Sequence, residues 1–163
     1  MPVNINTKQG NTITRHLERI FHAGLTRRWH TNAHLSGTCD RLDGHQARVA
    51  RIIMALWPDA SRELLIAALT HDDGEYITGD IPATLFKTDD QRAYEAAAYI
   101  TIWGDKFPSL SEEDGAKLHF ADKLDAYQWA YHHAPHLMGK PEWREAWAQI
   151  ESMALGLGVE VGE

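Results

Sequence analysis

Four residues of this sequence have the types and the order of a metal-binding site. They are two histidines and two aspartates, His45, His71, Asp72 and Asp122. Each falls on a segment with apolar residues at helical spacing, so a helix would turn each of them toward a protein core. A buried charge is costly unless it is paired or bound to a metal. Two imidazoles and two carboxylates inside a helical bundle suit one divalent transition metal, namely Mn, Co, Fe, Ni or Zn.

Each of these residues also has a simpler explanation when it is taken alone. His45 could be a hydrogen-bonded core histidine, His71-Asp72 could be a chance dipeptide, and Asp122 could pair with Lys123 or a neighbouring helix. His34 is an alternative first ligand, but its loop setting lacks the helical register. The prediction of a metal site therefore depends on the joint order of the four residues, separated by stretches that helices fill.

Hydrophobic periodicity predicts the helices that must position these residues. Apolar residues recur at helical spacing in about six segments, with no convincing alternating strand between them. The first predicted helix starts near residue 14. Capping residues place the other starts at or next to Asp43, Asp59, Thr88, Ser111 and Pro141. We therefore predict an all-α fold, with a single domain over residues 13–163 and a loose N-terminal arm over residues 1–12.

The composition excludes several classes of protein. The chain has 163 residues, of which 44% are hydrophobic and 24% are charged, as in an ordinary globular domain. Its net charge of −7 disfavours bulk nucleic-acid binding, and one cysteine, Cys39, excludes both an intramolecular disulfide and a Cys-rich zinc site. Its apolar runs fall far short of the roughly 20 residues of a membrane span, and it begins without a signal-peptide pattern. We expect a cytoplasmic protein with no membrane association.

The order of the four predicted ligands resembles the H…HD…D signature of the HD-domain metal-dependent phosphohydrolases. Further stretches extend the likeness, namely Arg28-Trp29, residues 71–75 (HDDGE), 78–82 (TGDIP) and 121–127 (ADKLDAY). They are similar to those of the YfbR-type 5′-deoxynucleotidases and of the DatZ-type dATP triphosphohydrolases of phages. The resemblance spans roughly Arg27 to Trp129. It implies an HD-domain helical bundle around one divalent metal, in the host cytoplasm if the protein is phage-encoded.

The resemblance also implies two catalytic carboxylates. Glu75 is expected one helical turn beyond His71 on the same face, where it could act as a general base or proton shuttle toward the attacking water. Asp80, in the 78–82 turn, could orient that water or protonate the leaving 5′-oxygen. Structural roles compete with both assignments, because Glu75 could bond a helix end and Asp80 could cap its turn.

Four further residues are candidates for binding the substrate. By resemblance, Arg28 contacts the phosphate, for which a guanidinium fork is well shaped, and Trp29 lies against the sugar or base. Arg27 and Lys87 could reach additional phosphates. The competing explanations are a solvated charge for each cation and a core position for Trp29.

The implied reaction is hydrolysis at the phosphorus bonded to the 5′-oxygen of a small-molecule deoxynucleotide, with the nucleoside as one product. A monophosphate would release phosphate, and a triphosphate such as dATP would release triphosphate. Mg²⁺ could bind the phosphates of the substrate. The sequence leaves both substrates open. Two alternatives are a non-catalytic nucleotide-binding or regulatory HD module and a helical protein with a structural metal. The resemblance implies a homodimer or larger homo-oligomer, and Trp143 and Trp147 could form its contact face or pack within the chain.

Overall fold

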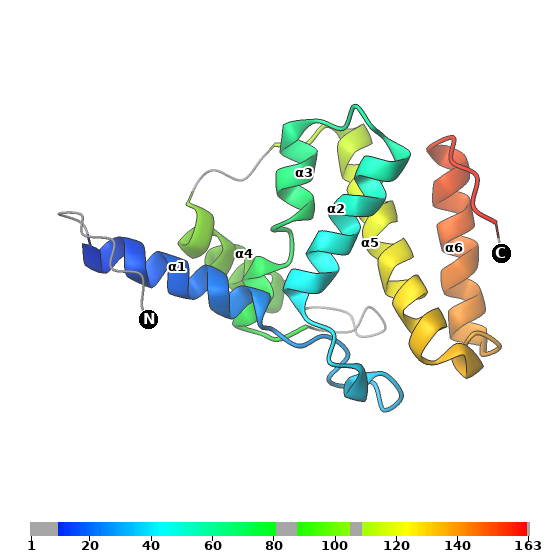
Figure 1. The fold of residues 1–163 in the computed structure, drawn as a ribbon, viewed down its shortest axis with the longest axis horizontal. Coiled ribbons are helices and arrows are strands. Elements are labelled where there is room, and N and C mark those ends of the chain that lie inside the picture. Colours follow the sequence, from blue (N-terminus) through cyan, green and yellow to red (C-terminus); the bar gives the residue numbers. More distant parts are fainter. Residues whose placement is uncertain (1–9, 81–87, 105–108, 163) are drawn as a thin grey trace.

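The computed structural model describes residues 10–80, 88–104 and 109–162, and over these residues the chain is helical (Figure 1). Its six α-helices are α1 (Gly10–Gly24), α2 (Leu42–Leu56), α3 (Arg62–Ala68), α4 (Asp89–Trp103), α5 (Glu112–His133) and α6 (Pro141–Gly156). Three short 3₁₀ helices join them, namely η1 (Ser36–Thr38), η2 (Asp73–Tyr76) and η3 (Pro135–Leu137). The described ranges contain no β-strand, and one isolated bridge pairs Arg27 with Arg41. The predicted all-α fold of about six helices is confirmed.

Several predicted helix starts match the structure. Thr88 and Gln91 form a capping box at the start of α4, the Ser111 side chain caps α5, and Pro141 is the first residue of α6. Three predicted helix starts were wrong. Helix α2 begins at Leu42, so Asp43 lies in its first turn and Arg41 takes the N-cap position. Helix α3 is capped by Ser61, whose side chain accepts a hydrogen bond from the Leu64 amide, instead of by Asp59. Helix α1 begins at Gly10, so residues 10–12 belong to a helix and not to a loose arm.

The core lies between α2, α3 and α5. Apolar side chains on these helices pack together, with Val49 and Ile53 from α2, Leu64 from α3 and Ala121 from α5 all buried. Helix α6 lies along the other side of α5 and buries Ile150 against it. In Figure 1 the α1 and α4 helices lie on the opposite side of the molecule from α6, and both contact η2. The turn between α3 and η2 therefore connects the α2–α3–α5 core to the side of the molecule formed by α1 and α4.

The tryptophans of α6 pack within the chain. Trp147 lies against Tyr127 of α5 with ring centroids 4.9 Å apart, and Trp143 contacts both Tyr127 and Trp29. The sequence left open whether these side chains face a second copy, and this packing gives them an intramolecular role. None of the described helices combines the length and the apolar character needed to cross a bilayer.

Candidate metal centre

The four residues singled out by sequence converge at one point in the fold. His45 comes from the first turn of α2, Asp122 comes from α5, and His71 and Asp72 come from the turn between α3 and η2. One ligand atom from each of the four lies within 4.8 Å of all the others. The Nε2 atom of His45 lies 3.1 Å from Asp122 Oδ1, and the Nε2 atom of His71 lies 3.2 Å from Asp72 Oδ2. This group could hold a metal ion.

Two adjacent ligands reach the same centre because the helix ends before them. Consecutive side chains of an α-helix point about 100° apart, so His71 and Asp72 would diverge if α3 continued. It ends instead at Ala68, and the chain then passes through a turn into η2. The prediction of one helical face extending through His71 to Glu75 was therefore wrong. Asp73 fixes the new path, because its carboxylate accepts hydrogen bonds from Gln46 and Trp103, each at 2.8 Å.

Both histidines point their Nε2 atom at the centre. The His45 Nδ1 atom lies 2.6 Å from Asp125 Oδ2, and the His71 Nδ1 atom lies 3.1 Å from the carbonyl oxygen of Ala68. Each Nδ1–H has an acceptor, which leaves Nε2 as the metal-facing atom. Both Nε2 atoms are buried, and neither makes a well-aligned hydrogen bond. A divalent cation would satisfy both nitrogens, so the donor set fits a metal.

The charges of the cluster also favour a cation. Burial alone would lower the pKa of His45, but the adjacent carboxylates of Asp122, Asp125 and Asp72 outweigh it and raise the pKa to about 10. The pKa of Asp72 is held well below its usual value by the two histidines, against the opposing effect of burial. Without a metal, a proton on His45 balances part of this negative charge. A bound divalent ion would replace that proton.

A second group of residues supports the His45 ligand and was not assigned by the sequence. Asp125 is 3% exposed and accepts from Arg48 Nε at 2.7 Å while it holds His45. The Arg48 guanidinium also bonds Asp40, at 2.9 Å. Asp125 lies three residues after Asp122, one turn along the same side of α5. That spacing was the available signal, because a metal-bound histidine commonly donates its other N–H to a carboxylate.

The Arg28-Trp29 pair lies beside this supporting group. Arg28 is buried, with Nη1 3.3 Å from Asp40 and 3.6 Å from Asp125. Trp29 has a positive φ of 62°, which is uncommon for a bulky residue. Its backbone N–H donates to Asp80 Oδ2 at 2.9 Å, and its indole N–H donates to Asp40. Asp80 therefore stabilises an unusual backbone conformation at Trp29, whatever else it does.

The remaining predicted substrate residues lie elsewhere or outside the description. Arg27 is exposed, and its guanidinium donates to the carbonyl of Ser36 at 3.2 Å. Lys87 and the last two residues of the predicted 78–82 turn, Ile81 and Pro82, lie outside the described residues. Glu75 is 5% exposed and lies on η2, three residues after Asp72.

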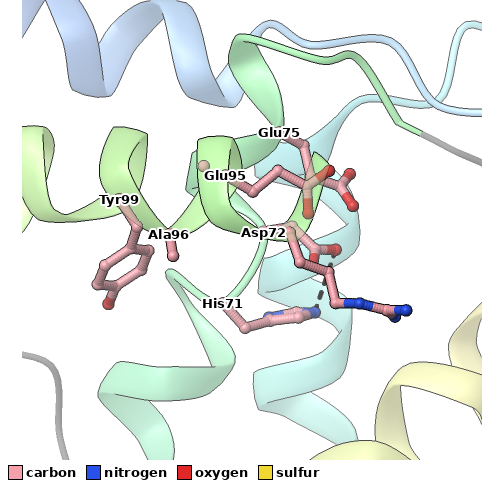
Figure 2. A pocket seen from close by; sticks show the side chains of 8 residues that line it. His71, Asp72, Glu75, Glu95, Ala96 and Tyr99 are labelled. Carbon is pink, nitrogen blue, oxygen red and sulfur yellow. Dashed lines mark ion pairs between the residues drawn. The ribbon is translucent and has the colours of Figure 1, made fainter. Parts of the chain in front are cut away.

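A pocket of about 190 Å³ adjoins the cluster (Figure 2). Its lining consists of His71, Asp72, Gly74, Glu75, Arg92, Glu95, Ala96 and Tyr99. The last four were missed by sequence reasoning. They lie at helical spacing along one side of α4, which is the signal that marks a shared face. In Figure 2 the carboxylates of Glu75 and Glu95 lie at the same end of the pocket as Asp72, and Tyr99 lies farther along α4.

Comparisons of the chain with protein-family models, with curated protein sequences and with solved structures found no match. The likeness to HD-domain phosphohydrolases therefore stays a prediction based on motifs. The case for a function depends on the geometry and the chemistry of the metal centre and of the pocket beside it.

Proposed function

We propose that this chain is a divalent-metal-dependent phosphohydrolase that cleaves a deoxynucleotide at its 5′-phosphate and releases the nucleoside. The observation that carries the proposal is the convergence of His45, His71, Asp72 and Asp122, with two buried imidazole nitrogens facing one point. This centre adjoins a pocket that can receive part of a small molecule. Perturbed ionisable groups beside a pocket are the usual mark of a catalytic site.

The donor set argues for a transition metal in a catalytic role. Two imidazoles with two carboxylates suit Mn, Co, Fe, Ni or Zn better than Ca or Mg, which prefer oxygen ligands alone. Structural zinc sites are mostly rich in cysteine, and no cysteine lies in this cluster. When bound here, a divalent metal supplies Lewis-acid chemistry: it polarises a phosphoryl oxygen and makes water a better nucleophile.

Glu75 is the residue we assign to proton transfer. Its carboxylate lines the pocket that His71 and Asp72 also line, and it is almost fully buried. In the proposed reaction the oxygen of a water molecule forms a bond to phosphorus and gives one proton to Glu75. The bond between phosphorus and the 5′-oxygen breaks, and that oxygen takes up a proton, which completes the nucleoside.

Asp80 is the second carboxylate that we assign to the reaction. One of its oxygens holds the Trp29 amide, which fixes the position of the carboxylate relative to the Arg28-Trp29 segment. In the proposal it orients the attacking water or protonates the leaving 5′-oxygen. Arg28 is the proposed contact to the phosphate. The expectations that Trp29 meets the sugar or base and that Arg27 and Lys87 reach additional phosphates come from the resemblance alone.

Monophosphates and triphosphates share the bond that is cleaved. A dNMP gives nucleoside and phosphate, as in a 5′-deoxynucleotidase, and a dNTP such as dATP gives nucleoside and triphosphate. The choice between a dNMP and a dNTP depends on how much positive charge neutralises the outer phosphates. Mg²⁺ bound to a triphosphate is one source of that charge. Both substrates therefore belong in the same test.

A product assay tests the proposal. Metal-stripped protein is reloaded with Mn²⁺, Co²⁺ or Zn²⁺ and incubated separately with dAMP and with dATP, and the products are separated by chromatography. Deoxyadenosine from either substrate, formed only with metal, supports the proposal, and the second product tells the two activities apart. Metal and nucleotide binding with no product would instead favour the non-catalytic nucleotide-binding module.

A further inference from the structure

The pocket beside the metal centre has a lining that selects what can enter it. It lies where η2 packs against α4, and Gly74 permits this contact, since a Cβ there would overlap the backbone carbonyl of Glu95. His71 and Asp72 belong to both the pocket and the metal centre. A molecule held at the metal centre by one group can therefore extend its next group directly into the pocket.

The charges of the pocket disfavour phosphate. Besides the metal ligands His71 and Asp72, two carboxylates line it, from Glu75 and Glu95, against one guanidinium, from Arg92. One oxygen of Glu95 also accepts a hydrogen bond from the Thr78 hydroxyl at 2.8 Å. Arg92 is mostly exposed and lies 3.6 Å from Asp89 on its own helix, so it is already shared with another carboxylate. A phosphate dianion would meet net repulsion here at separations of a few ångströms. A neutral group that donates hydrogen bonds would meet acceptors, because an ionised carboxylate only accepts.

The volume of the pocket, about 190 Å³, suits a compact organic group. Gly74 of η2 and Ala96 of α4 add little bulk to the lining. Tyr99 places a ring farther along α4, and its hydroxyl is fixed by Thr70 at 2.9 Å. An aromatic ring and small residues beside hydrogen-bond acceptors can receive a group that is partly apolar and that also donates hydrogen bonds.

We infer that this pocket is the subsite for the neutral part of the substrate, with its phosphate held at the metal centre. Glu95 accepts a hydrogen bond from a hydroxyl of the sugar or an amino group of the base. Ala96 sets the size of the group that fits. The inference rests on the proposed function, because it uses the metal centre as the position of the phosphate, and it adds the class of group that the pocket recognises.

Two neighbouring alanines of α4 provide the test. Ala96 and Ala97 are both exposed on α4, but only Ala96 lines the pocket. Ala96→Leu fills the pocket, and Ala97→Leu adds the same bulk beside it and serves as the matched control. Glu95→Gln keeps the size of the side chain and removes its charge. Each Co²⁺-loaded variant is titrated by calorimetry with a non-hydrolysable 5′-phosphonate analogue of dAMP, which stands for dAMP in the binding results below, and, separately, with inorganic phosphate.

We expect wild-type protein to bind dAMP more tightly than inorganic phosphate. Ala96→Leu should weaken dAMP binding by about tenfold or more, with Co²⁺ and phosphate binding unchanged and with Ala97→Leu like wild type. Glu95→Gln should weaken dAMP binding by about tenfold, the loss expected for a hydrogen bond to a charged group. All three outcomes support the subsite.

Three other results would overturn it. These are equal affinity of wild type for dAMP and phosphate, unchanged dAMP binding in Ala96→Leu, and an equal loss of phosphate binding in Ala96→Leu, which would place the phosphate in the pocket. The failure of the proposed function gives a different result. Tight dAMP binding that depends on Ala96, with no hydrolysis of dAMP or dATP under any metal, would support the subsite and refute the enzyme.

Discussion

Replacing Asp125 by alanine removes the carboxylate that orients His45 in the metal centre. In the wild-type chain this carboxylate lies 2.6 Å from His45 Nδ1 and 2.7 Å from Arg48 Nε, and it is almost fully buried. The histidine ring loses its only described acceptor at Nδ1, so its tautomer and its orientation are no longer fixed. Losing such a partner typically lowers metal affinity about 10- to 100-fold. We expect about 100-fold for Asp125→Ala and about tenfold for Asp125→Asn, whose amide oxygen still accepts a hydrogen bond.

The same substitution should also destabilise the fold. Arg28 and Arg48 both lose a carboxylate partner, and breaking a buried ion pair costs about 3–5 kcal/mol. Both cations keep Asp40, so we expect about 3 kcal/mol for Asp125→Ala. Asp43→Asn is the control, because Asp43 lies two residues from His45 and forms an exposed ion pair with Arg41.

Co²⁺ titration followed by the visible absorption of the bound ion measures the affinity, and chemical denaturation of the metal-free variants measures the stability. The affinity is determined on protein that is folded by circular dichroism, which separates a lost ligand orientation from a lost fold. Wild-type affinity and an unchanged Co²⁺ spectrum in Asp125→Ala would refute the role of Asp125, whatever the change in stability.

Glu75→Gln should lower kcat by about 10²- to 10⁴-fold, the usual contribution of a general base, while Co²⁺ affinity stays at the wild-type value; wild-type turnover by this variant would remove Glu75 from the reaction. Gly74→Ala should destabilise the chain by about 1–3 kcal/mol in thermal unfolding, because its Cβ would overlap the Glu95 carbonyl. Gly115→Ala, in α5 with open space around it, should be neutral or stabilising by up to about 1 kcal/mol, and equal effects of the two would contradict the close contact. In metal-free protein the pKa of His45 rises from 6.5 to about 10 on folding, so its contribution to stability is fully present below pH 6.5 and is lost as the pH rises toward 10. Apparent Co²⁺ affinity should change in the opposite direction and increase with pH over this range, because the ion displaces that proton; a metal affinity that falls with rising pH would contradict the proton exchange.

The sequence predicted the convergence of the four residues better than the path of the chain through them. His45 and Asp122 were placed correctly because each lies in a regular helix, where hydrophobic spacing determines which side faces the core. His71 and Asp72 join the group as expected, but the helix predicted to carry them ends at Ala68. Tertiary contacts stabilise the end of the helix, above all the two hydrogen bonds to Asp73 from distant residues. The hydrophobic spacing within one segment cannot reveal such contacts.

The surroundings of the centre were harder to predict. The positive φ of Trp29 is stabilised by Asp80, which lies 51 residues later in the sequence, and no local pattern marks it. The pocket residues Arg92 and Glu95 share one side of α4, which spacing could have indicated, but only the packing of α4 on η2 turns that side toward the metal ligands. Asp125 had the clearest unused signal, one turn beyond Asp122 on α5.

The most direct test of metal-dependent hydrolysis adds Co²⁺ stepwise to metal-free protein and measures nucleoside release from dAMP and dATP at each step. We expect release to rise in proportion to added Co²⁺ and to stop rising at one equivalent per chain, with no activity in Asp122→Ala at the same metal concentrations. Full activity in the metal-free chain or in Asp122→Ala, or no release at any ratio from protein that has bound the metal, would contradict a catalytic metal at His45, His71, Asp72 and Asp122.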